Sequence, residues 1–97
     1  MDAQHEASAQ PRYVAAPAEA LRIVPLDALT AIYHRASGIT HLVESPVPEL
    51  IALLRAPLTV AALMERLETE FDLLDPDPAA LADRLAELET IGLVARA

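Results

Sequence analysis

The hydrophobic positions of the chain change their spacing near residue 45. Before that point, short runs rich in β-branched and aromatic residues predict three strands, at 21–24, 28–35 and 39–44. Pro25 closes the first strand, and Gly38 ends a three-residue turn in which it is free to adopt a positive φ. The connections between these strands are short, so we expect an antiparallel sheet.

The turn also sets a predicted register for the second and third strands. A three-residue turn places Arg35 opposite Ile39. In that register two histidines, His34 and His41, point to opposite faces of the sheet. A metal site needs three or four convergent ligands, and neither another histidine nor a cysteine lies nearby. We therefore interpret both as structural or surface histidines and expect no metal site; a pH-tuned contact is the alternative.

The rest of the chain predicts three helices, because apolar residues there recur at helical spacing. Ser45 is the expected cap of the first helix, which ends before Pro57. Thr59 is the expected cap of the second helix, Asp77 caps the third, and Gly92 is its natural stop.

Three strands followed by three helices predict one α+β domain of winged-helix type, with a three-stranded antiparallel sheet that the helices cover on one face. A chain of 97 residues is long enough for one small core. Residues 1–19 show no hydrophobic period, so we expect a flexible N-terminal tail, with a short extended piece near Tyr13 and Val14, and a domain over residues 20–97.

The charge of the chain argues against nucleic acid as a partner. Fifteen acidic residues outweigh seven basic ones, a formal net charge of −8, and such a surface repels phosphate backbones. In the third predicted helix Arg84 is the single basic residue among three acidic ones. A DNA-binding recognition helix needs more donors than that, so an acidic winged-helix transcriptional regulator is kept only as an alternative.

Residues that carry catalytic chemistry are scarce in this sequence. Cysteine and lysine are absent, and two glycines cannot make a glycine-rich phosphate loop. Carboxylates spaced along the second helix, such as Glu65 and Glu68, lack the pattern of a calcium loop and are interpreted as a solvated face. We expect a protein that is not an enzyme and has no cofactor.

The ends and the hydropathy of the chain favour a cytoplasmic location. The first twelve residues, MDAQHEASAQPR, have neither a positive segment nor an apolar segment of the kind found in signal peptides. No apolar run approaches the roughly 18 residues that a membrane span requires.

Three stretches of the sequence resemble the PqqD-like peptide chaperones, also called RiPP recognition elements. They are SGITHLVESP, LIALLRAPLTVAALMERLETEFD and LAELETIGLV. The likeness covers about Leu21 to Val94, and the first twenty residues have no match. The Ser37-Gly38-x-Thr40-His41 turn is similar to the subgroup associated with a kinase related to HPr kinase, whereas the best-known relatives serve pyrroloquinoline quinone formation.

The resemblance implies a binding role. In this family a precursor or leader peptide adds to the edge of the third strand, lies against the third helix, and is presented to a modifying enzyme of the radical or kinase-related type. Carried onto this chain, the implied peptide-binding residues are Ile39, Thr40, His41, Leu42 and Val43 on the strand, and Leu81, Arg84, Leu85 and Leu88 on the helix.

The residues of the third strand are independently consistent with an open edge. An edge strand presents unpaired N–H and C=O groups that a peptide can bind, and residues 39–43 contain neither lysine nor proline to block it. The acidic surroundings favour a basic peptide. Two alternatives stay open: the helix leucines fill the core instead of a groove, and the edge serves self-association, as in a homodimer or another protein–protein interaction subunit.

Overall fold

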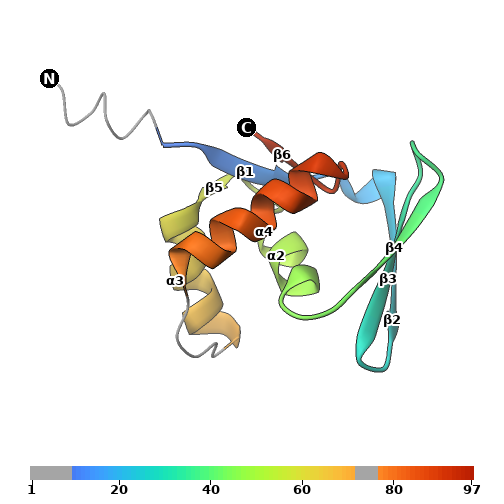
Figure 1. The fold of residues 1–97 in the computed structure, drawn as a ribbon, viewed down its shortest axis with the longest axis horizontal. Coiled ribbons are helices and arrows are strands. Elements are labelled where there is room, and N and C mark those ends of the chain that lie inside the picture. Colours follow the sequence, from blue (N-terminus) through green and yellow to red (C-terminus); the bar gives the residue numbers. More distant parts are fainter. Residues whose placement is uncertain (1–9, 72–76) are drawn as a thin grey trace, which may run out of the picture.

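The computed structural model describes residues 10–71 and 77–97 and combines helices with two small sheets (Figure 1). The elements in chain order are β1 (Arg12–Ala15), the 3-10 helix η1 (Ala18–Ala20), β2 (Leu21–Leu26), β3 (Leu29–His34), β4 (Ile39–Val43), α2 (Val47–Leu53), β5 (Leu58–Thr59), α3 (Val60–Phe71), α4 (Pro78–Thr90) and β6 (Val94–Arg96). The sequence predicts a loop over DLLDPDP, residues 72–78, of which residues 72–76 lie outside the described residues, as do the first nine residues of the expected tail.

One of the two sheets is the predicted one. Strands β2, β3 and β4 form a three-stranded antiparallel sheet in that order, and three α-helices follow it, so the α+β class is confirmed. Figure 1 shows this sheet standing to one side of the helices. The second sheet, in the order β5-β1-β6, was not predicted. Its outer strands have two and three residues, too few to show a hydrophobic period.

Strand β1 moves the start of the ordered fold ahead of the predicted boundary. It pairs antiparallel with both β5 and β6, and the side chains of Tyr13 and Ala15 are buried. The extended piece expected near Tyr13 and Val14 is therefore an integral strand of the domain. The boundary at residue 19 lies too late because the sequence of the first twenty residues does not show the buried position of Tyr13.

The starts of α3 and α4 follow from their first residues, as predicted. The Thr59 hydroxyl accepts a hydrogen bond from the Ala62 N–H at 3.2 Å, and the Asp77 carboxylate accepts one from the Ala79 N–H at 3.0 Å. Such side-chain acceptors satisfy donors that a helix start leaves free. After α4, Gly92 adopts a φ of 86°, which explains why a glycine ends the helix.

The predicted cap of α2 is wrong. Helix α2 begins at Val47 after Pro46, with no side-chain cap. The Ser45 hydroxyl instead donates a hydrogen bond to the Glu49 carboxylate at 2.9 Å. Pro46 occupies the cap position itself, so Ser45 lies one residue outside it and does not accept from the first helical N–H groups.

The core lies among the helices and reaches both sheets. Its fully buried side chains come from β3, α2, the turn after α2, α3, α4 and the segment before β6; they are Ile32, Leu50, Ile51, Leu54, Leu63, Leu85 and Leu93. This distribution shows that one core holds every layer together. Among the described residues, none of the helices has both the length and the apolarity needed to cross a bilayer.

Candidate peptide-binding edge

The register of β3 and β4 differs by one residue from the predicted one. His34 pairs with Ile39, and Ile32 pairs with His41. The turn between them has four residues, with the Gly38 N–H donating to the His34 carbonyl at 2.8 Å. Because side chains alternate along a strand, a slip of one residue exchanges the faces. His34 and His41 therefore point to the same face as Ile32, which corrects the expectation of opposite faces.

The two histidines have different surroundings although they share a face. The His34 Nδ1 lies 2.9 Å from the Ser37 hydroxyl, and its ring packs beside Gly92. The Nε2 of His41 is buried and has no hydrogen-bond partner within the part of the chain that the structure describes. In residues 10–71 and 77–97, no group of three or more His, Asp or Glu side chains is arranged to hold a metal ion.

We expect the substitution His41→Phe to raise the free energy of unfolding by about 1 kcal/mol, because it removes a buried polar atom that has no partner. Thermal denaturation followed by circular dichroism measures the change. The matched control is His34→Phe, which deletes the contact with Ser37 and should give no gain. A lower melting temperature for His41→Phe would show that Nε2 is satisfied in solution.

Backbone hydrogen bonds identify the groups that β4 presents at its edge. The Arg35 N–H donates to the Ala20 carbonyl at 3.0 Å, so odd-numbered residues of β3 bond toward β2. The even-numbered residues of β3 therefore bond toward β4, where they meet residues 39, 41 and 43. The N–H and C=O groups of Thr40 and Leu42 then point away from β3. In the sheet that the described residues form, β4 is the last strand, so these four groups face outward at its edge.

The other edge of the same sheet, β2, is less open. Pro25 was expected to end this strand, but it pairs with Thr30 and the strand continues to Leu26. By the same alternation, Pro25 occupies a position whose nitrogen faces outward, which is where an edge strand tolerates proline. It removes one donor from that edge. Strand β4 contains no proline, so it is the better acceptor of an added strand.

A cleft of about 360 Å³ runs between the edge of β4 and helix α4. Its lining residues are Leu42, Val43, Glu44, Val47, Arg84, Glu87, Leu88 and Ile91. Val47 and Leu88 are buried and supply an apolar floor, whereas Leu42 is 62% exposed and Ile91 38% exposed. The cleft therefore offers apolar contact area directly beside the unpaired backbone of β4.

Three charged side chains border this cleft. A nitrogen of the Arg84 guanidinium lies 3.1 Å from a Glu87 carboxylate oxygen, one turn further along α4. The Glu44 carboxylate is exposed and makes no ion pair or hydrogen bond with the part of the chain that the structure describes. The cleft thus has one compensated pair of charges and one carboxylate that is available to a ligand.

The predicted site residues fall into three groups. Leu42, Val43, Arg84 and Leu88 line the cleft together, and Leu88 is also a buried core residue. Ile39, Thr40 and His41 belong to the same edge strand but lie outside the cleft. Leu81 and Leu85 are buried among the core residues, in agreement with the alternative that they fill the core. Peptide binding by all of these residues stays a prediction.

Sequence reasoning missed four cleft residues, namely Glu44, Val47, Glu87 and Ile91. A signal for two of them was present. Glu87 and Ile91 follow Arg84 at spacings that place all three on one face of a helix. Val47 and Glu44 had no such signal, because their position depends on the path of the chain between β4 and α2.

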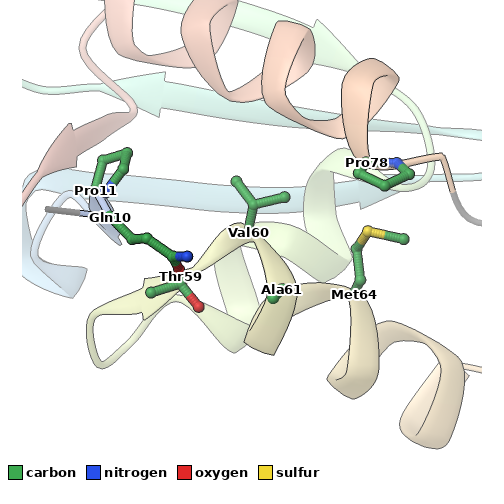
Figure 2. A pocket seen from close by; sticks show the side chains of 7 residues that line it. All are labelled: Gln10, Pro11, Thr59, Val60, Ala61, Met64 and Pro78. Atoms are coloured by element: carbon green, nitrogen blue, oxygen red, sulfur yellow. The ribbon is translucent and has the colours of Figure 1, made fainter. Parts of the chain in front are cut away.

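A second cavity, of about 340 Å³, lies near the start of α3 and is shown in Figure 2. Its lining residues are Gln10, Pro11, Thr59, Val60, Ala61, Met64 and Pro78. None of these side chains is charged, and the Thr59 hydroxyl already accepts the hydrogen bond that caps α3. Apart from the Gln10 amide, this cavity offers a ligand mainly apolar surface, so we take the β4 edge as the candidate site.

Comparison of the chain with protein-family models, with curated proteins and with solved structures finds no match. The likeness to the PqqD-like chaperones therefore stays a prediction from the quoted sequence stretches. The geometry of the β4 edge is the observation on which a functional proposal can be built.

Proposed function

We propose that this protein is a non-catalytic, peptide-binding adaptor of winged-helix type, related to the PqqD-like chaperones. It docks a precursor or leader peptide on β4 and presents it to a separate modifying enzyme of the radical or kinase-related type. One observation carries the proposal: the edge of β4 that presents the outward backbone groups of Thr40 and Leu42 runs into the apolar cleft against α4, which Leu42 lines. An added strand finds main-chain partners and side-chain contacts in one place.

The physics of strand addition suits this edge. A peptide that pairs with Thr40 and Leu42 gains main-chain hydrogen bonds, each worth about 0.5–1.5 kcal/mol net. Its side chains on the cleft side lie against the floor formed by Val47 and Leu88, where burial of apolar surface adds affinity. Backbone pairing fits many sequences, so the cleft supplies the selectivity. Such a site binds and positions a peptide without any reacting group of its own.

The experiment is amide hydrogen exchange followed by NMR, using peptides selected from a random nine-residue library displayed on phage. We expect the amides of Thr40 and Leu42 to exchange fast in the free protein and slowly in the complex. The amides of His41 and Val43, which bond toward β3, should be protected in both states and serve as internal controls. Protection that appears only outside β4 and α4 would refute docking at this edge.

A specific observation also favours a second candidate, a protein–protein interaction subunit that self-associates. The face of the β2–β3–β4 sheet opposite Ile32 carries exposed aliphatic side chains; they are Val24, Leu26, Leu29 and Leu42. Exposed apolar patches of this kind are typical of interaction surfaces. Analytical ultracentrifugation separates the candidates, because a stable homodimer in the absence of peptide would support this one.

A further inference from the structure

The cleft beside β4 has an unequal distribution of charge. Two carboxylates, of Glu44 and Glu87, border it with only one guanidinium, that of Arg84. Because Arg84 is paired with Glu87, the carboxylate of Glu44, directly after β4, has no ion-pair partner among residues 10–71 and 77–97. A peptide that lies on this edge passes close to that carboxylate.

The register of β4 determines which peptide side chains enter the cleft. Val43 points to the same face as Ile32, toward the core, while Leu42 points to the outer face. A peptide residue placed opposite Val43 would point to the Val43 face, because cross-strand neighbours share a face. There it would meet Leu88 and Ile91. An apolar side chain fits this position, since the cleft floor is apolar and buried.

We propose, on the basis of the proposed function, that the β4 edge selects a segment with two features. One is an aliphatic or aromatic side chain opposite Val43 that fills the cleft. The other is a lysine or arginine within two residues of it that pairs with the Glu44 carboxylate. The class of partner is therefore an extended, basic and apolar peptide segment rather than an acidic one.

The charge of the rest of the molecule acts in the same direction. Helix α4, which forms the far wall of the cleft, carries Asp83, Glu87 and Glu89 against Arg84 alone. With a formal net charge of −8, the chain attracts a basic peptide from a distance and repels an acidic one. Glu44 then fixes where along the peptide the positive charge must lie.

The test is selection from the random nine-residue phage library on three versions of the protein: the wild type, Glu44→Lys and Glu65→Lys. The control Glu65→Lys makes the same change in net charge on the exposed surface of α3, among residues that do not line the cleft. We expect the wild type and Glu65→Lys to enrich peptides with lysine or arginine within two residues of an apolar position. Glu44→Lys should enrich acidic residues there and bind the wild-type peptides about tenfold more weakly.

The outcomes of the selection test the role of Glu44 separately from the proposed adaptor function. Enriched peptides that protect the β4 amides but show no preferred basic position would overturn the role of Glu44 and leave the adaptor function standing. Equal loss of the basic preference in both variants would assign it to overall charge, which also overturns the inference. If no version enriches any peptide, the proposed function itself is refuted.

Discussion

Replacing Leu85 with alanine is expected to lower the free energy of unfolding by about 3 kcal/mol. The side chain has 0% relative exposure and lies in the core that α4 shares with the other helices. Truncation of a fully buried leucine removes its transfer free energy and leaves a cavity, and such changes cost about 2–5 kcal/mol. Urea denaturation measured by circular dichroism gives the difference directly.

The matched control is Leu42→Ala, which makes the same chemical change at a side chain that is 62% exposed. It should cost less than about 1 kcal/mol, because little of that side chain leaves water on folding. The pair of variants also decides between core and groove for Leu85. Normal stability together with weakened peptide binding in Leu85→Ala would place this residue in the binding surface.

The substitution Leu42→Pro is expected to weaken peptide binding at least about tenfold while the domain stays folded. The Leu42 N–H faces outward, so proline at this position costs no hydrogen bond within the sheet. An added strand loses that donor, and its own carbonyl is left without a partner, at a cost of about 1–3 kcal/mol. Fluorescence anisotropy with a labelled peptide from the phage selection measures the loss.

Ile23→Pro is the control for this variant. Ile23 is the corresponding outward-facing position of β2, the opposite edge of the same sheet, and it is partly exposed. It should have a similar effect on stability and leave peptide affinity unchanged. Equal loss of affinity in both variants would mean that proline acts by distorting the sheet, and unchanged affinity in Leu42→Pro would exclude backbone pairing at β4.

The helices could be predicted from sequence because their signals are local. Thr59 and Asp77 accept backbone hydrogen bonds within three residues of themselves, and Gly92 needs only its own backbone freedom. The apolar stripes follow from the period of the helix and require no knowledge of the partner. These features depend on residues that are neighbours in the chain, so they can be predicted from the sequence without knowing the tertiary structure.

The β elements were harder to predict because their signals are not local. The residues from Arg35 to Gly38 are compatible with a turn of three or four residues, and the choice reverses the face of every residue in β4. Strands β5 and β6 exist because β1 lies between them, and a strand of two or three residues has no pattern of its own. The N-terminal boundary was misplaced for the same reason.

The strand and the helix that form the candidate site could be predicted, but only some of the side chains that line it could. The resemblance to the PqqD-like chaperones implied a surface formed by β4 and α4, and four of the nine residues that it named line the cleft. Leu81 and Leu85 were named through the resemblance, whereas the apolar stripe that they share with Leu88 favoured the core, where both are buried. Glu44 and Val47 line the cleft because of the direction that the chain takes between β4 and α2, which the sequence does not show.

The pairing of β1 with β6 has a consequence for the mechanics of the domain. The N-terminal end of β1 lies beside the C-terminal end of β6, with the Ala97 N–H donating to the Arg12 carbonyl at 2.9 Å. Tension applied through the two termini therefore pulls these strands apart sideways, so their hydrogen bonds break one after another instead of sharing the load. The molecule would unzip from its ends at low force, with the β2–β3–β4 sheet outside the path of the load.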